Sequence, residues 1–261
     1  MIEPNNIYNL DCVEGMKQIE TESIDCVVTD CPYLIIAGGV RVEYMDDESS
    51  EVLNRGRKII SDGTNCSNKW VKKGNEVPSA VKNGKMFTHN NIQFHEWLPQ
   101  VYRILKKGTH CYIMINSRNL KELQQECENV GFVFQNLLIW NKGNATPNKY
   151  YMQGAEFILF LSKRPAKNIN EMGTTNIFNI PNVRNKTHPT EKPTKLLEQL
   201  IKNSTNVNDI VLDPFIGSGS TINACINTNR KFLGFEIDKE YYDIATNRIK
   251  EANGQTGLFA F

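Results

Sequence analysis

Residues 208–238 form a strand–turn–helix–strand pattern whose residue types could bind a nucleoside. An apolar run ends at Asp213, the turn Phe215-Ile216-Gly217-Ser218-Gly219 follows, and the next apolar run ends at Glu236. Glycines in such a turn let the backbone approach a ligand, and a carboxylate ending the second strand can accept hydrogen bonds from both ribose hydroxyls. The pattern therefore predicts a nucleoside-binding unit. The alternative is a tight turn without a ligand.

The glycine content of this turn indicates which nucleoside fits. Only two glycines of the dinucleotide-binding pattern are present, and the Gly-Lys-Ser/Thr sequence of the triphosphate-binding loop is missing. A turn with few glycines and a phenylalanine suits a ligand that has a ribose and an adenine but no pyrophosphate. The turn therefore points to S-adenosylmethionine rather than NAD.

The turn Asp30-Cys31-Pro32-Tyr33 directly follows a predicted buried strand, where open α/β sheets bind their ligands. It could assist methyl transfer to the exocyclic amine of a base, whose lone pair is delocalised into the ring. The Asp30 carboxylate and the Cys31 carbonyl, held by Pro32, can accept both amine hydrogens and localise that lone pair. Tyr33 offers a flat face to a base flipped out of the duplex. Asp, Pro and Tyr are also ordinary turn residues, so the motif by itself is weak.

Alternating strand and helix patterns surround these two turns and predict an α/β fold. We expect a Rossmann-like, mostly parallel sheet of seven strands with two basic inserts. Strands are predicted over residues 24–29, 110–115, 132–140, 156–162, 209–212 and 231–236, with 132–140 and 156–162 as an antiparallel pair. Helices are predicted over residues 94–106, 119–130, 192–203, 220–228 and 239–251. The first helix should end at Lys107-Gly108, and Pro193 should lie in the first turn of helix 192–203.

The composition restricts the class of protein. The 261 residues are 40% hydrophobic and have a net charge of +1, which excludes a wholly disordered chain. No apolar run reaches the roughly 18 residues of a membrane span, and the N-terminus lacks the pattern of a secretory signal. We therefore expect a cytoplasmic protein. Seven cysteines without a Cys-x-x-Cys pair, and four scattered histidines, predict reduced thiols and no metal site.

The charges are strongly segregated along the chain. Residues 1–52 carry 2 basic and 12 acidic side chains, residues 53–88 carry 8 and 2, and residues 141–195 carry 9 and 3. The two basic segments contain interleaved aromatic residues, which suits binding to DNA phosphates and bases. The alternative is that they are solvated surface loops. The predicted DNA-binding residues are Arg55, Arg57, Lys58, Lys69, Lys72, Lys73, Lys142 and Lys149.

Taken in chain order, the motifs resemble those of the permuted β class of S-adenosylmethionine-dependent DNA amino-methyltransferases, of the N6-adenine and N4-cytosine type. In that circularly permuted class the catalytic motif precedes the cofactor motif. The resemblance rests on Tyr8 to Cys12, Asp30 to Tyr33, Trp97 to Ile115, Trp140 to Lys142, His188 to Pro193, Asp213 to Thr221, Gly234 to Glu236 and Tyr241. It covers nearly all of the chain except residues 41–88 and about 164–187.

The resemblance implies roles for particular residues. The chain should begin with a strand that bears an acidic residue, Asp11, which would hold the adenine amino group of the cofactor. Glu236 would hold the ribose, and Lys192 and Pro193 would close over the methionine end. The implied cofactor-binding residues are Asp11, Asp30, Lys192, Pro193, Phe215, Gly217, Ser218, Gly219, Ser220, Thr221 and Glu236, and the implied catalytic residues are Asp30, Cys31, Pro32 and Tyr33.

The resemblance also implies a single methyltransferase domain over residues 1–261. Residues 41–88 would be a basic insert, and residues 143–187 a short target-recognition region that includes the core strand 156–162. Two features depart from the family pattern. Cys31 stands where the family has proline, and the recognition region is short, so the 41–88 insert could share the work of holding DNA.

The implied activity is methylation of adenine N6 in double-stranded DNA, in a bacterial or phage cytoplasm at the nucleoid, either as a restriction partner or alone. Asp30 favours adenine, because members that methylate cytosine N4 more often have serine there; cytosine N4 is the alternative. Methylation of RNA or protein glutamine, a non-catalytic DNA-binding module, and a C5-cytosine enzyme using Cys31 as nucleophile are less favoured. Relatives are often dimers, so a homodimer is compatible with the sequence, which does not give the recognition site.

Overall fold

The computed structural model describes residues 2–32, 92–146, 151–183 and 191–257. The described strands are β1 (Asn6–Tyr8), β2 (Ile24–Asp30), β3 (Leu105–Ile115), β4 (Val133–Thr146), β5 (Gln153–Ser162), β6 (Ile177–Asn179), β7 (Ile210–Asp213) and β8 (Lys231–Phe235). The described helices are α1 (Cys12–Lys17), α3 (Phe94–Ile104), α4 (Leu120–Val130), α5 (Thr194–Ser204), α6 (Ser220–Asn227) and α7 (Lys239–Gly257). Within these residues, none of the helices has the length and apolar character needed to cross a membrane.

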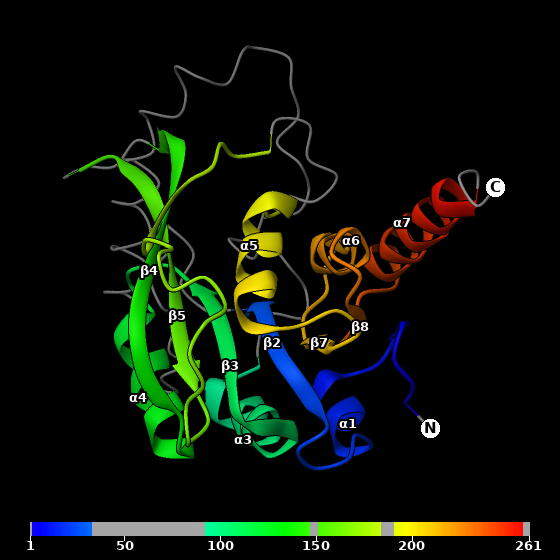
Figure 1. Ribbon diagram of the computed structural model, residues 1–261, viewed down its shortest axis with the longest axis horizontal. Coiled ribbons are helices and arrows are strands. Elements are labelled where there is room, and N and C mark those ends of the chain that lie inside the picture. The colour runs from blue at the N-terminus through cyan, green and yellow to red at the C-terminus, as the bar shows by residue number, and fades with distance from the viewer. Residues whose placement is uncertain (1, 33–91, 147–150, 184–190, 258–261) are drawn as a thin grey trace, which may run out of the picture. The chain divides into compact units, whose positions relative to one another are not determined.

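The eight strands form one sheet in the order β1-β8-β7-β2-β3-β5-β4-β6 (Figure 1). Strands β1, β8, β7, β2 and β3 are mutually parallel, and β4 pairs in parallel with β6. Only β5 among the described strands runs antiparallel to its neighbours β3 and β4. The predicted α/β class, the mostly parallel sheet and the antiparallel pair are confirmed.

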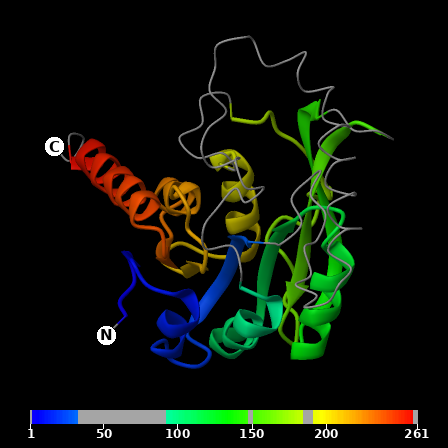
Figure 2. The ribbon, with the colours of Figure 1, turned by 180° about the vertical axis from the view of Figure 1, so that it is seen from behind.

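The sheet has a hydrophobic core on each face, because successive strand residues point to opposite sides. In β2, Val27 belongs to one core, whereas Cys26 and Val28 belong to the other. Helices α1, α3 and α4 contribute to the first core, and α5, α6 and the Ala245 position of α7 contribute to the second. Helix α7 lies on the β8 side of the sheet (Figures 1 and 2).

The order of the strands creates a switch point between β2 and β7. From β2 the chain continues, through residues outside the described part, to α3 and then to the neighbouring β3. From β7 it passes through α6 to β8 on the other side. Ligands in open α/β sheets bind at the carboxyl ends of the strands where such a reversal occurs. Asp30, which ends β2, and Asp213, which ends β7, lie at this switch point.

Several details of the predicted elements were wrong. The sheet has eight described strands rather than seven, because the three-residue β6 is too short to show a pattern and forms by pairing with β4. Strand β1 ends at Tyr8, so Asp11 does not lie on a strand but at the N-cap of the short helix α1, which was not predicted. Pro193 is the N-cap of α5 rather than a residue of its first turn.

The start of β3 also differs from the prediction. Helix α3 ends at Ile104, and β3 begins at Leu105, so Lys107-Gly108 lies inside a strand and does not end a helix. Gly108 has a φ of +82°, and a Cβ there would lie 2.8 Å from the Pro165 carbonyl oxygen. The register between β2 and β3 shifts at this place. The glycine therefore allows an irregular strand to pass close to a neighbouring chain segment.

Candidate active site at the carboxyl edge of the sheet

The parallel strands bring three acidic residues to the same edge of the sheet. Asp30 is the last residue of β2, Asp213 is the last residue of β7, and Glu236 directly follows β8. Because β2, β7 and β8 are adjacent and parallel, their carboxyl ends meet at this edge. The catalytic and cofactor motifs, whose first residues Asp30 and Asp213 are 183 positions apart in the sequence, thus lie next to each other.

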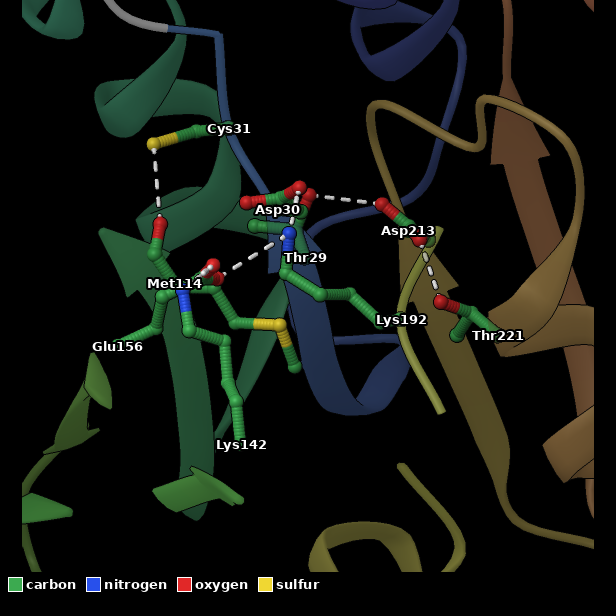
Figure 3. Close-up of polar contacts among 9 residues, drawn as sticks. All are labelled: Thr29, Asp30, Cys31, Met114, Lys142, Glu156, Lys192, Asp213 and Thr221. Atoms are coloured by element: carbon green, nitrogen blue, oxygen red, sulfur yellow. Dashed lines mark hydrogen bonds and ion pairs between the residues drawn. The ribbon is translucent and has the colours of Figure 1, made fainter. Parts of the chain in front are cut away.

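Asp213 connects β2, β7 and α6 through a buried carboxylate (Figure 3). The Thr29 hydroxyl donates to its Oδ1 at 2.7 Å, and the Thr221 hydroxyl donates to its Oδ2 at 2.6 Å. The Phe215 N–H also donates to Oδ1, at 3.0 Å. Burial raises the pKa of Asp213 to about 6, although these three hydrogen bonds act in the opposite direction. The carboxylate thereby fixes the start of the glycine turn.

The glycine turn adopts the conformation that its sequence predicts. Gly217 and Gly219 have φ values of +54° and +88°, which residues with a Cβ rarely adopt. Gly219 is the N-cap of α6, and the Ile216 N–H donates to the Phe235 carbonyl of β8 at 3.0 Å. The half-buried Phe215 ring packs edge-on against Trp97 of α3, with the two ring centroids 5.2 Å apart. Ser218, Ser220 and Thr221, which are also predicted cofactor residues, are buried.

Two backbone N–H groups hold the Glu236 carboxylate in place. The Gly217 N–H donates to Oε2 and the Asp238 N–H donates to Oε1, both at 2.8 Å. Burial raises the pKa of Glu236, and these two backbone hydrogen bonds act against that effect. Each carboxylate oxygen has two lone pairs, so the carboxylate retains acceptor capacity for the hydroxyls of a ribose.

Asp11, the N-cap of α1, follows three residues after the end of β1, the strand that pairs with β8. Its Oδ1 accepts hydrogen bonds from the Val13 N–H at 2.9 Å and the Glu14 N–H at 3.1 Å. The Glu236 N–H donates to the Tyr8 carbonyl at 3.1 Å, which joins the two strand ends. Asp11 therefore caps α1 while it stands at the same edge of the sheet as Glu236.

A second group of charged residues extends from Asp30 through Lys192 (Figure 3). The Lys192 ammonium donates to Asp30 Oδ2 and lies 3.6 Å from Glu156 Oε2. The Lys142 ammonium donates to the other oxygen of Glu156, Oε1, at 3.2 Å. Burial lowers the pKa of Lys192, but the charges of Asp30 and Glu156 outweigh this effect and raise it above its ordinary value. Lys192 is therefore a buried ammonium between two carboxylates.

Cys31 has the surroundings of a packing residue. Its side chain is buried, and its thiol donates weakly to the Met114 carbonyl at 3.7 Å. Burial raises the pKa of the thiol, and the Asp30 charge raises it further. A nucleophilic cysteine needs a lowered pKa and an accessible position, so these surroundings argue against covalent catalysis by Cys31.

The predicted site residues fall into three groups. Asp11, Asp30, Cys31, Pro32, Lys192, Pro193, Phe215, Gly217, Ser218, Gly219, Ser220, Thr221 and Glu236 lie at or beside the ends of the parallel strands or at the N-cap of α5. Lys142, predicted to bind DNA, has only 11% of its side chain exposed and pairs with Glu156. Tyr33, Arg55, Arg57, Lys58, Lys69, Lys72, Lys73 and Lys149 lie outside the described residues.

Sequence reasoning missed three residues of this site: Thr29, Glu156 and the carboxylate of Asp213. Thr29 was assigned only to a strand end. Asp213 was assigned to a strand end and to the first position of the cofactor motif, without a role for its carboxylate. Glu156 lies within an otherwise apolar predicted strand, and this single charge in the run EFILFLS was the available signal. Across the antiparallel ladder Glu156 is paired with Trp140, next to the Asn141-Lys142 sequence. No group of three or more His, Cys, Asp or Glu residues in the described ranges could hold a metal ion.

The chain is similar to a set of known methyltransferases. Residues 24–247 match the family described as DNA methylase, N6_N4_Mtase. The type II methyltransferase M2.MboI of Moraxella bovis is 28% identical over 265 residues, which cover 94% of this chain and 88% of the relative. The DNA adenine methyltransferase YhdJ of Escherichia coli K12 is 30% identical over 293 residues, which cover 96% of this chain and 84% of the relative.

Solved structures resemble the fold as well. The M1.HpyAVI–SAM complex has a TM-score of 0.61 and 25% sequence identity, and the match covers 93% of this chain and 98% of that chain. The cytosine-N4-specific PvuII DNA methyltransferase has a TM-score of 0.63 and 16% identity, covering 98% of this chain and 93% of that chain. At this low identity, the PvuII likeness shows the fold alone.

Proposed function

The chain belongs to the DNA methylase family, and from this premise we propose that it transfers a methyl group from S-adenosylmethionine to the N6 amine of a flipped-out adenine in DNA. The observation that carries the proposal is the position of Asp30. Asp30 is the last residue of β2, at the switch point of the sheet. Its carboxylate lies at the same edge as Asp213 and Glu236, where a nucleoside would bind. A methyl acceptor and a methyl donor can therefore meet there.

The residues at this edge fit S-adenosylmethionine. Gly217 and Gly219 bring backbone close to the ligand space, and Glu236 is already oriented to accept the ribose hydroxyls. When bound, the cofactor supplies an electrophilic methyl group on a sulfonium. The Phe215 side chain would contact the cofactor, and Asp11 would accept a hydrogen bond from its adenine amino group. Lys192 and Pro193 would lie at its methionine end.

Asp30 and the turn after it would activate the target amine. The Asp30 carboxylate and the Cys31 carbonyl accept hydrogen bonds from the two N–H groups of the amine, which localises the nitrogen lone pair. Lys192 orients Asp30 by donating to Oδ2. The predicted role of Tyr33, stacking on the flipped base, and that of Pro32, holding the carbonyl, complete the arrangement. Most of the rate enhancement in such a displacement comes from holding the reactants in line, for which about 7–11 kcal/mol is available.

Adenine is favoured over cytosine as the target. The relative from Escherichia coli, 30% identical, is named a DNA adenine methyltransferase. Asp30 at the first position of the motif agrees with that choice. The similarity to the cytosine-N4-specific PvuII enzyme concerns the fold and does not favour cytosine. Double-stranded DNA is the partner, and the relatives named type II methyltransferases support a place in restriction–modification. A cytoplasmic location and a homodimer stay predictions.

Methyl transfer to unmodified DNA tests this function. The protein is incubated with S-adenosylmethionine carrying a tritiated methyl group, and the DNA is digested to nucleosides. N6-methyladenine should be the labelled product. Label in N4-methylcytosine would contradict the choice of base, and absence of label in DNA would contradict the activity.

Replacing Asp30 tests the role of its carboxylate. Asp30→Ala should lower the turnover rate by at least about 100-fold, as for the loss of a preorganised polar group at a reacting centre. S-adenosylmethionine binding, measured by calorimetry, should change by less than about tenfold, which corresponds to about 1.4 kcal/mol. Asp25→Ala is the matched control, because Asp25 lies at the opposite end of β2 and pairs with Lys106 at 2.6 Å. Near-normal turnover by Asp30→Ala would refute the acceptor role.

A further inference from the structure

Four charged side chains of alternating sign form a row beside the reaction centre, which we call the charge chain: Lys142, Glu156, Lys192 and Asp30 (Figure 3). Lys142 and Glu156 are 3.2 Å apart, Glu156 and Lys192 are 3.6 Å apart, and Lys192 donates directly to Asp30. The four residues come from β4, β5, the segment before α5, and β2. The charge chain thus links the antiparallel part of the sheet to the catalytic strand β2.

Glu156 occupies the middle of this row. One of its oxygens, Oε1, faces Lys142, and the other, Oε2, faces Lys192. It is linked to Asp30 through Lys192, whose ammonium contacts both carboxylates. The exposed fraction of the Lys192 side chain is 8%, compared with 31% for that of Glu156. The lysine charge is therefore the one that depends most on its partners, because a buried charge is costly unless it is paired.

The second carboxylate changes what Lys192 does to Asp30. If Asp30 were its sole carboxylate partner, the buried Lys192 ammonium would compete strongly with the target amine for hydrogen bonds to the Asp30 oxygens. With Glu156 on its other side, the ammonium is shared, and the formal charges of the four side chains cancel. The position of the ammonium is also set from two sides, which fixes the Asp30 Oδ2 that it contacts.

We propose that Glu156 is a positioning residue for methyl transfer, which holds the Lys192 ammonium between two carboxylates and so sets the orientation and the acceptor strength of Asp30. This inference rests on the proposed function. It deepens that function by assigning a role to a strand residue that the catalytic and cofactor motifs do not include.

The pH dependence of the rate gives a readout that a merely structural role would not move. Among the described residues, the charged groups that face Lys192 include Asp30 from β2 and Glu156 from β5, with Lys142 behind Glu156. The Cys31 thiol and the Asp213 carboxylate lie near Asp30. The charges of Asp30 and Glu156 both raise the pKa of Lys192. If the ammonium is needed for turnover, removing the Glu156 charge must move the loss of activity at alkaline pH to a lower pH.

The test compares kcat against pH, at saturating DNA and cofactor, for the wild type and Glu156→Gln. The glutamine variant should lose at least about tenfold in kcat at neutral pH, and its alkaline limb should move down by about 1 pH unit, the smaller end of the effect of a nearby opposite charge. Glu156→Asp keeps the charge and should return the limb towards that of the wild type. Asp25→Asn is the control: it removes another carboxylate that bridges strands of the sheet, at the opposite end, and should leave the limb in place.

Lys142→Met supplies a test with the opposite sign and does not depend on the folding of the Glu156 variants. Without Lys142, the whole Glu156 charge acts on Lys192, so the alkaline limb should move to higher pH. An unmoved limb in Glu156→Gln, or a downward shift in Lys142→Met, would overturn the inference. Because all comparisons are ratios to a wild type that methylates DNA, these results are distinct from failure of the proposed activity, which the wild-type nucleoside analysis reports.

Discussion

Asp213 shows at the scale of one residue how the fold holds the two halves of the site together. Its carboxylate accepts hydrogen bonds from the hydroxyls of Thr29 on β2 and Thr221 on α6. One side chain thus joins the catalytic strand β2 to α6, the helix that follows the glycine turn. Its burial has a cost, because a carboxylate in a low-dielectric interior is less stable in its charged form. This cost raises the pKa of Asp213 from 3.8 to about 6.

The raised pKa predicts a pH dependence of stability. The folded state binds the Asp213 proton more tightly than the unfolded state does, so the stabilisation from this group is fully present below about pH 4 and is lost as the pH rises through about 6. Asp213→Asn removes this contribution. Between pH 4 and pH 7 the wild type should therefore lose stability relative to the variant. The free energy of unfolding of the variant minus that of the wild type should rise by up to about 3 kcal/mol.

Urea denaturation of both proteins over this pH range measures that difference. Titrations of groups that do not interact with Asp213 are common to both proteins and cancel in the comparison. A difference in unfolding free energy that stays constant from pH 4 to pH 7 would show that Asp213 does not titrate in this range.

At the scale of the element, the turn between β7 and α6 depends on the fit of Gly219. Its φ of +88° already disfavours other residues, and a Cβ there would lie 3.2 Å from the Ala245 Cβ of α7 and 3.3 Å from Ile222 Cδ1. Gly219 therefore serves two purposes: it allows the left-handed turn, and it allows α7 to pack closely against the turn. Gly143 has a similar φ of +72° but nothing within 4 Å of its Cβ position.

Comparing alanine substitutions at these two glycines separates packing from backbone strain. Both variants pay the cost of a left-handed alanine, about 1–2 kcal/mol. Gly219→Ala must also displace its neighbours, so its midpoint of thermal unfolding should fall further than that of Gly143→Ala. Because the turn bears Phe215 and Gly217, its affinity for S-adenosylmethionine should fall about tenfold, or about 1.4 kcal/mol, whereas Gly143→Ala should bind normally. Equal losses in both variants would contradict a packing role for Gly219.

The elements differ in how well they could be predicted from the sequence alone. Buried strands such as β2 and β8 were predictable because an apolar run between turn residues is a strong local signal. The glycine turn was predictable because its chemistry is contained in nine consecutive residues. The contact of Glu156 with Lys192 was not, because 36 residues separate them and their meeting depends on the register of β4 and β5 and on where α5 begins. The three-residue β6 likewise exists only through its partner β4.

At the scale of the whole molecule, the net charge of +1 hides an uneven distribution that matters for DNA binding. The acidic N-terminal segment contains Asp11 and Asp30, which the site uses, and the basic surplus lies in residues 53–88 and 141–195. In the sequence, residues 53–88 follow the catalytic motif Asp30 to Tyr33. We therefore predict that this basic insert contributes contacts to DNA phosphates.

A control for this idea comes from lysines at the other end of the sheet. Lys17 lies in the last turn of α1, Lys107 lies near the amino end of β3, and Lys202 lies in the last turn of α5. All three are exposed. Their replacement by glutamine changes the net charge by the same amount as replacing Lys69, Lys72 and Lys73, but at the edge opposite Asp30.

The salt dependence of DNA binding distinguishes these two sets of lysines. Each phosphate contact contributes about −0.9 to the slope of log affinity against log salt concentration, since binding releases condensed counterions. Replacing Lys69, Lys72 and Lys73 by glutamine should weaken binding and reduce the magnitude of the slope by up to about 2.7. The variant at Lys17, Lys107 and Lys202 should keep the wild-type slope, because contacts and not total charge set it. Fluorescence anisotropy with a DNA duplex at several salt concentrations measures both slopes. If the two variants had the same slope, the insert would contribute only to the overall charge, and DNA binding would have to be assigned to other parts of the chain.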